Sequence, residues 1–135
     1  MNENDAHILE TAIRAARVGG QLALSRLGNP GYQKWKGPRD LLAGAVLDIQ
    51  ASIVAVIREE FPDDNLLVEE SDTPQDEQAD PLWIIDPLDG SLNFYHGIPL
   101  FAMCVGYRTA GKYRVGVVYD PCRDELFQAT LSSGA

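Results

Sequence analysis

The sequence predicts an α+β fold in which two long helices are layered on a mostly antiparallel sheet. Apolar residues recur at helical spacing up to about residue 60, and beyond residue 66 they gather in short runs separated by turn residues. The chain has 135 residues and a hydrophobic content of 45%, which is enough for one domain with its own core. We therefore expect residues 1–135 to form a single domain.

Two helices are predicted in the first half of the chain. The first covers residues 5–27, where Asn4 or Asp5 can cap its start and Gly28 begins the segment that stops it. Residues 29–40 are predicted to be a polar loop. The second helix covers residues 44–60 and has one apolar face, formed by Val46, Ile49, Ile53, Val56 and Ile57.

The second half of the chain predicts strands. Residues 66–68 form a short strand that leads into Glu69, and residues 82–85 form a continuously apolar, buried strand that leads into Asp86. Pro87 lacks a backbone donor, so the chain is expected to leave the sheet there. A short helix is expected over residues 91–95, followed by a meander of strands at residues 102–109, 113–119 and 125–130.

The acidic residues are concentrated in one stretch. The net charge is −9, and residues 59–89 hold twelve carboxylates and no lysine or arginine. Such a surface repels nucleic acid and anionic lipid, so neither nucleic acid nor a membrane is expected as a partner. No apolar run approaches the ~20 residues that span a bilayer, and the N-terminus lacks the features of a secretory signal. Cys104 and Cys122 have no CxxC spacing and are expected to be reduced thiols of a cytoplasmic protein.

The segment DPLDGS, at residues 86–91, carries the clearest chemical signal. Asp86 ends a buried strand, and Asp89 can turn back to the same side three residues later. Two carboxylates held together repel each other unless a cation lies between them, and hard oxygen ligands suit Mg²⁺. The Leu88 carbonyl is a further candidate ligand, and Glu69 supplies a third carboxylate from an independent strand. Asp-Pro and Asp-Gly are also ordinary turn formers, so a tight loop without metal is the competing interpretation.

Gly90 and Ser91 follow the candidate metal ligands directly. Gly90 permits the close approach of another backbone, and free N–H groups at the start of the helix form an anion site. One short stretch therefore offers cation ligands and a phosphate-binding backbone side by side. Metal-assisted phosphoryl hydrolysis requires this combination.

Residues 83–94 resemble the signature W-I-x-D-P-[IL]-D-G-T-x-N-F of the inositol monophosphatase family, within the lithium-sensitive, magnesium-dependent sugar-phosphatase superfamily. Residues 68–71 resemble its G-E-E-S element, and residues 115–121 resemble the strand that follows. The similarity covers nearly the whole chain from about Lys36. It implies the N-terminal half of the sugar-phosphatase fold.

The resemblance also implies a role for each site residue. Four residues match the family's metal ligands: Glu69, Asp86, Leu88 (through its carbonyl) and Asp89. Asp89, Gly90 and Ser91 match the contacts to the substrate and its phosphate. Glu69 and Ser91 form the implied catalytic set, in which the Ser91 hydroxyl stands where the family usually has threonine and orients the attacking water.

The start of the second helix departs from the family pattern, which reads D-x-V-T-x-A-D and whose last Asp supports the water-activating hydroxyl. Here Asp40 is kept, but Ala43 and Val46 stand at the places of the Thr and the last Asp. Asp48 lies about 200° further around the helix and cannot simply substitute. Because general-base assistance is worth typically about 10²–10⁴-fold, hydrolysis is expected to be weak.

Length is the second departure. The family continues into a second domain with the motif W-D-x-A-A-G, whose Asp completes a metal site, and this sequence contains no such segment. The expectation is an N-terminal domain only, with the C-terminal domain absent.

The predicted function is the Mg²⁺-dependent hydrolysis of a small phosphate monoester, such as an inositol monophosphate, by metal-activated water. A phosphoadenosine-type nucleotide or a sugar bisphosphate stays open as the substrate. The alternative is a truncated remnant that binds cation or phosphate, or dimerises, with weak turnover or none, and a homodimer is left open. Lys36 and Arg39 could approach a phosphate, and His96 either contacts substrate or satisfies a backbone carbonyl at a helix end.

Overall fold

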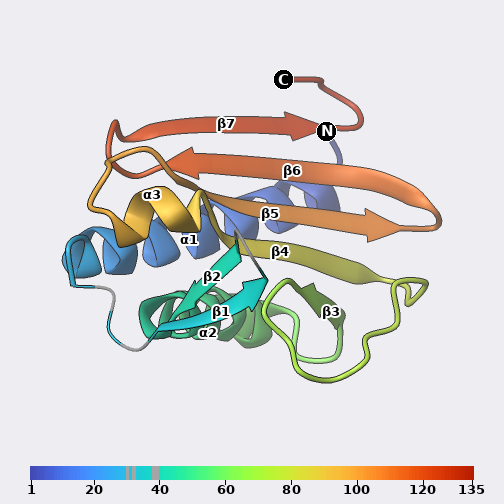
Figure 1. Ribbon diagram of the computed structural model, residues 1–135. Coiled ribbons are helices and arrows are strands. Elements are labelled where there is room, and N and C mark those ends of the chain that lie inside the picture. Colours follow the sequence, from blue (N-terminus) through green and yellow to red (C-terminus); the bar gives the residue numbers. More distant parts are fainter. Residues whose placement is uncertain (30, 32, 38–39) are drawn as a thin grey trace.

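The computed structural model describes residues 1–29, 31, 33–37 and 40–135, and it shows helices layered on one sheet (Figure 1). The helices are α1 (Glu3–Arg26), α2 (Gly44–Glu60) and α3 (Ser91–Tyr95). The strands are β1 (Gln33–Gly37), β2 (Asp40–Ala43), β3 (Asn65–Val68), β4 (Leu82–Asp89), β5 (Ala102–Thr109), β6 (Lys112–Asp120) and β7 (Glu125–Thr130). The predicted α+β class is confirmed.

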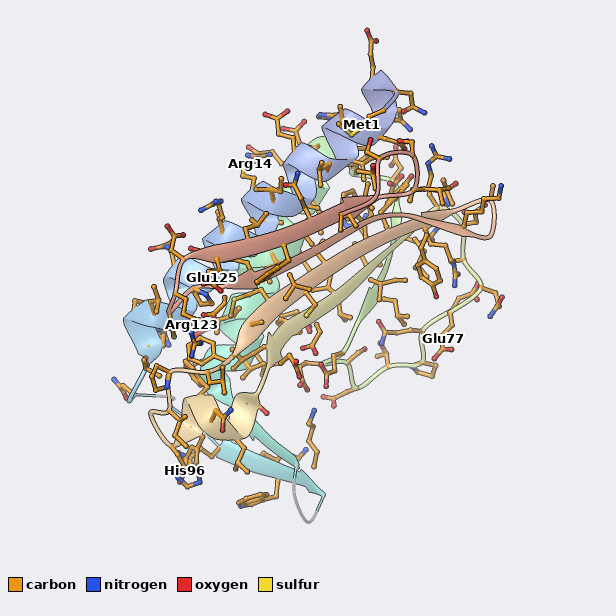
Figure 2. All side chains as sticks on the ribbon, turned by 90° about the horizontal axis from the view of Figure 1, so that it is seen from above. Met1, Arg14, Glu77, His96, Arg123 and Glu125 are labelled. Carbon is orange, nitrogen blue, oxygen red and sulfur yellow. The ribbon has the colours of Figure 1, made fainter. Side chains whose placement is uncertain are left out.

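The main sheet has five strands in the order β3-β4-β5-β6-β7. Only β3 and β4 pair in parallel, and the three pairs from β4 to β7 are antiparallel, which agrees with the prediction of a mostly antiparallel sheet. The helices α1 and α2 pack against each other and against β4, β5 and β6. Figure 2 shows both long helices on the same side of the sheet.

Both long helices are where the apolar spacing predicts them. The helix α1 starts two residues earlier than expected, because the Asn2 side chain caps it by accepting the N–H of Asp5 at 2.7 Å. The helix α2 has the predicted bounds, and its buried positions include all five residues of the predicted apolar face.

The prediction of a polar loop at residues 29–40 is wrong in part. Residues Gln33–Gly37 form β1, which pairs antiparallel with β2 in a separate two-stranded sheet. The strand β1 pairs with β2 through its backbone, and its large side chain Trp35 remains 58% exposed. A strand of this kind leaves no alternation of apolar and polar residues in the sequence.

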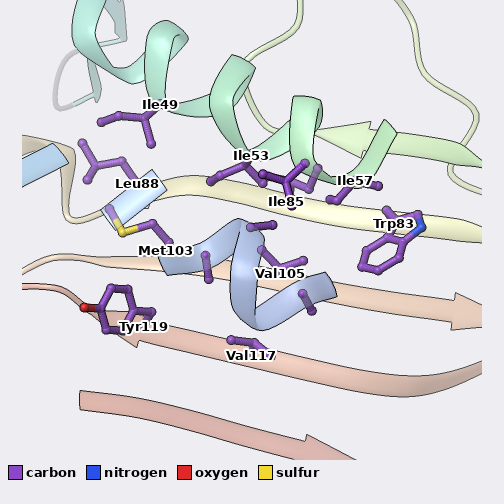
Figure 3. Close-up of a cluster of buried hydrophobic side chains, with 14 of the residues drawn as sticks. Ile49, Ile53, Ile57, Trp83, Ile85, Leu88, Met103, Val105, Val117 and Tyr119 are labelled. Carbon is purple, nitrogen blue, oxygen red and sulfur yellow. The ribbon is translucent and has the colours of Figure 1, made fainter. Parts of the chain in front are cut away.

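The core lies between the helices and the sheet (Figure 3). Ile49, Ile53 and Ile57 of α2 project toward β4, where Trp83 and Ile85 are buried. The indole N–H of Trp83 donates to Asp64 at 3.0 Å, so this large side chain is buried with its polar atom satisfied. Burial is therefore concentrated on one face of the sheet.

Gly20 lies where α1 packs closely against Tyr119 of β6. A Cβ at this position would lie 2.6 Å from the ring of Tyr119, which is fully buried and whose hydroxyl donates to Asp124 at 2.7 Å. Because Tyr119 is fixed at both ends, Gly20→Ala is expected to lower the free energy of unfolding by about 1–3 kcal/mol, despite the better helix propensity of alanine. Urea unfolding checks this, with Gly116→Ala as the control, since no atom lies within 4 Å of a Cβ there. Equal stability of Gly20→Ala and the wild type would contradict the close crossing.

Candidate metal and phosphate site

Glu69 and Asp86 meet at the end of the parallel pair β3–β4. Val68 and Ile85 are register partners, and the Glu69 N–H donates to the Ile85 carbonyl at 3.1 Å. Both carboxyl groups therefore leave the sheet at the same end. A hydrogen bond with Asp86, together with burial and the nearby charges of Asp86 and Glu70, raises the pKa of Glu69 to about 7. Two carboxyl groups held at neighbouring strand positions are a natural place for a cation.

Asp89 and the Leu88 carbonyl lie three and two residues beyond Asp86 along the chain. The Leu88 N–H donates to the Asp86 carboxylate at 3.1 Å, which forms a tight Asx turn, and Asp89 is exposed. Burial, and after it the charges of Asp86, Asp89 and Glu69, raise the pKa of the Cys104 thiol to about 11. The negative charges of all three carboxylates therefore reach the Cys104 thiol.

The three carboxylates are not assembled into a finished metal centre. Within the part of the chain that is described, no three His, Cys, Asp or Glu side chains form a group that could hold a metal ion as they stand. The donor set of carboxylate and carbonyl oxygens suits Mg²⁺, while Asp89 has to join the Glu69–Asp86 pair to complete it. The predicted ligand set of Glu69, Asp86, Leu88 and Asp89 stays a prediction.

The strand β4 does not end at Pro87, so this expectation is wrong. It continues to Asp89, which pairs with Ala102 after a register shift between Asp86 and Asp89. The parallel partner β3 is paired only as far as Ile85, so beyond this point β4 is bonded through β5 alone. A proline is tolerated where its missing N–H faces no neighbouring strand or lies in a bulge.

Gly90 turns the chain from β4 into α3 and comes close to another segment. Its φ is +93°, and a Cβ would lie 3.0 Å from the Leu100 carbonyl oxygen and 3.3 Å from the Phe101 Cα. Only glycine fits both conditions. The short helix α3 begins at Ser91, as predicted, and Ser91 is half-buried beside this turn.

Gln50 is a supporting residue that the sequence did not single out. Its side-chain amide donates to the Glu70 carbonyl at 2.8 Å and accepts the Glu70 N–H at 3.1 Å. Gln50 therefore binds both backbone groups of Glu70, the residue that follows Glu69. Lys36 of β1 pairs with both oxygens of the Glu70 carboxylate at 2.9 Å. A glutamine among apolar residues of a helix was the available signal.

Replacing Gln50 with leucine is expected to weaken Mg²⁺ binding by about 10–100-fold, the usual effect of removing a group that positions a ligand. The two lost hydrogen bonds leave the Glu70 backbone unpaired and Glu69 loosely held. Calorimetric titration with Mg²⁺ measures the change, and Ser52→Ala on the same helix is the control, because its hydroxyl donates only to Ile49. Unchanged affinity in Gln50→Leu would show that Glu69 does not depend on this clamp.

Several other predicted residues have contacts elsewhere in the structure or lie outside the described side chains. Val46 is 1% exposed and belongs to the hydrophobic core, while Asp48 is exposed and pairs with Arg26 at 3.2 Å. His96 is exposed at the end of α3, where its backbone N–H donates to the Leu92 carbonyl and its ring packs on Tyr95. Arg39 and the side chains of Asp40 and Ala43 lie outside the described part of the structure.

The chain matches the Inositol monophosphatase family over residues 4–135. The chain belongs to this family. The Nus factor SuhB of Pasteurella multocida is 37% identical, in a match that covers 95% of this chain and 49% of that relative. The Nus factor SuhB of Escherichia coli K12 is 38% identical with the same coverage. The chain thus spans about half the length of the curated relatives it matches.

Solved structures agree with the fold. The extragenic suppressor protein suhB of Bartonella henselae superposes with a TM-score of 0.88 at 33% identity, over 95% of this chain and 50% of that one. An IMPase of Thermotoga maritima gives 0.87 at 36% identity, with the same coverage. An IMPase/NADP phosphatase solved with Mg²⁺ and phosphate gives 0.73 at 26% identity, over 84% of this chain and 45% of that one. The predicted resemblance to half of the sugar-phosphatase fold is confirmed.

The remaining expectations about location and partners stay predictions. No helix in the described residues has the length and apolarity needed to cross a membrane. Cys104 and Cys122 are both unpaired, as expected of reduced thiols.

Proposed function

We propose that this chain binds Mg²⁺ through Glu69, Asp86, Asp89 and the Leu88 carbonyl, and that it hydrolyses a small phosphate monoester such as an inositol monophosphate. The observation that carries the proposal is the Glu69–Asp86 carboxyl pair directly beyond the last residues that β3 and β4 pair, Val68 and Ile85. Two acidic groups at neighbouring strand positions repel each other unless a proton or a cation lies between them. Family membership supports the same chemistry.

The chain's own residues supply the rest of the proposed site. The backbone at Gly90 and Ser91 follows Asp89 directly, and its N–H groups at the start of α3 would receive the phosphate. The Ser91 hydroxyl would orient the water that attacks. A bound Mg²⁺ would supply Lewis-acid polarisation of the phosphoryl group and a lowered pKa of water.

Weak turnover is part of the proposal, because the buried Val46 stands where the family motif at the start of the second helix has its last Asp. The same observation favours the second candidate, a remnant that binds cation or phosphate without turnover. Phosphate release from inositol 1-phosphate, with Mg²⁺ and with chelator, separates the two.

We expect slow release that depends on Mg²⁺. The double variant Ala43→Thr/Val46→Asp restores the family pattern and is expected to raise the rate by about 10²–10⁴-fold if it stays folded, which its melting curve reports. If calorimetry shows Mg²⁺ binding but neither the wild type nor the folded double variant releases phosphate, the second candidate, a remnant that binds without turnover, is supported. No binding at all would overturn both candidates.

A further inference from the structure

The strand β3 lies at one edge of the five-stranded sheet, so within the described residues only one of its two sides is paired with a strand. Backbone groups of successive strand residues point to alternate sides. The Glu69 N–H points to β4, where it donates to the Ile85 carbonyl at 3.1 Å. The N–H and the carbonyl of Val68 therefore point to the free side of β3, where the sheet leaves them unpaired.

Gln75 takes the place of a neighbouring strand at Val68. Its side-chain amide accepts the Val68 N–H at 2.8 Å and donates to the Val68 carbonyl at 2.8 Å. A glutamine side chain carries both an acceptor oxygen and donor N–H groups, so it can bind both backbone groups of one strand residue. Gln75 is half-buried in the acidic loop that connects β3 and β4, while the residues on either side of it are exposed. The loop thus turns this one side chain inward, onto the strand.

Gln50 of α2 makes the same kind of contact two residues further along the chain, at Glu70. We call these two side chains, Gln50 and Gln75, with their hydrogen bonds to the backbones of Glu70 and Val68, the glutamine bracket. Glu69 lies between the two residues that the bracket holds, and its own N–H is bound to β4. The backbone at Glu69 is therefore fixed by the helix, by the acidic loop and by the sheet.

The acidic loop that carries one half of the bracket is fastened to the sheet at its other end. Arg108 of β5 donates to the backbone carbonyls of Glu77 and Ala79. The Asp80 carboxylate accepts the Ala110 N–H, with both oxygens at 3.1 Å. The loop is thus held independently of the bracket, so it can act as a support for the strand end that it contacts.

We propose that Gln75 is a positioning residue of the candidate metal site, and that the glutamine bracket makes this site selective for Mg²⁺ over Ca²⁺. The inference rests on the proposed function, because it takes Glu69 as a metal ligand. Mg²⁺ requires near-ideal octahedral geometry at about 2.0–2.1 Å, whereas Ca²⁺ accepts flexible geometry at about 2.3–2.6 Å. A carboxylate on a loosely held backbone therefore weakens Mg²⁺ binding more than Ca²⁺ binding.

Gln75→Leu removes both hydrogen bonds to Val68 and keeps a side chain of similar size. Calorimetric titration of the metal-free chain is expected to show an affinity for Mg²⁺ reduced by about 10–100-fold, and an affinity for Ca²⁺ reduced by a smaller factor. Gln78→Leu is the matched control, since Gln78 is an exposed glutamine of the same loop, and it is expected to bind both ions like the wild type. Gln75→Asn keeps the amide on a shorter side chain and is expected to shift the two affinities in the same direction. Lower stability alone would not change the ratio of the two affinities in the folded chain.

Amide hydrogen exchange gives a readout that needs no metal. In Gln75→Leu the Val68 N–H loses its acceptor and the backbone at Glu69 loses one of its supports. Both amides are therefore expected to exchange faster than in the wild type, while the amide of Val105 in the middle of the sheet keeps its rate.

The outcomes separate this inference from the proposed function. If the wild type binds Mg²⁺ and Gln75→Leu binds it equally well, or loses both ions by the same factor, the inference is overturned and the proposed function stands. Unchanged exchange at Val68 and Glu69 in the variant also overturns it, because the bracket then does not hold the strand end. A wild-type chain that binds no Mg²⁺ overturns the proposed function and, with it, the role given to Gln75.

Discussion

Asp86→Asn is expected to abolish measurable binding of Mg²⁺. Asp86 is the central ligand of the proposed site, because it pairs with Glu69 across the β3–β4 end and begins the turn that carries Leu88 and Asp89. An amide oxygen can still accept the Leu88 N–H, so the turn is expected to survive while the negative charge is lost. Removing a group that only positions a ligand weakens metal binding by about 10–100-fold, and a direct ligand is expected to exceed this.

Calorimetric titration and the Mg²⁺-dependent shift in melting temperature measure the loss. Asp76→Asn is a matched control, since Asp76 also accepts a backbone N–H two residues on, from Gln78 at 2.9 Å, but lies in the acidic loop away from the β3–β4 end. The control is expected to bind Mg²⁺ like the wild type. Equal binding by both variants would show that the metal is held by diffuse negative charge and not at Asp86.

The long helices and most of the sheet could be predicted because burial imposes a period on them. The helix α2 and the strand β7 have the bounds that the sequence indicated, since one face of each is defined by apolar or turn residues. The strand β1 could not be found in this way. Its exposed residues pair with β2 through the backbone, and backbone pairing alone leaves no mark on side-chain type.

At Pro87 the pairing of the surrounding strands overrides the local preference of proline to end a strand. Proline normally ends a strand, but here the parallel neighbour stops first, and the bulge after Asp86 absorbs the missing donor. That arrangement depends on where β3 ends, which is at Val68, 19 residues before Pro87. The residues around Pro87 do not indicate where β3 ends, so they cannot predict that β4 continues.

The sequence indicated which two acids would lie together at the candidate site, but not how the backbone beside them is held. Glu69 and Asp86 are brought together by β3 and β4, as two strands ending in acids suggested. The Gln50 clamp on Glu70 was missed, because it joins residues 20 positions apart through backbone groups that every residue has. Only the tertiary structure determines which glutamine side chain lies beside a backbone that it can bind.

The buried ion pair between Asp5 and Arg114 is expected to be the largest single polar contribution to stability. Asp5 is fully buried in the first turn of α1, and its two carboxylate oxygens accept from Arg114 of β6 at 2.7 and 2.6 Å. Asp5→Asn leaves the guanidinium without its anion. We expect a loss of about 2–4 kcal/mol in the free energy of unfolding, toward the lower part of the range for breaking a buried pair, because the Arg114 side chain is 25% exposed. Urea unfolding measures it, with the exposed Glu3→Gln of the same turn as control.

The same pair gives the fold an acid dependence whose direction follows from the pKa of Asp5. The Arg114 hydrogen bonds lower this pKa from its ordinary value of 3.8, against the opposing effect of burial. The unfolded chain therefore binds a proton at Asp5 at a higher pH than the folded chain does, so the stability from this pair is full above about pH 3.8 and is lost as the pH falls through the folded value. The stability gap between wild type and Asp5→Asn is expected to narrow on acidification below pH 4, while Glu3→Gln follows the wild type throughout. A gap that stays constant with pH would mean that Asp5 stabilises the fold by packing and hydrogen bonding without its charge.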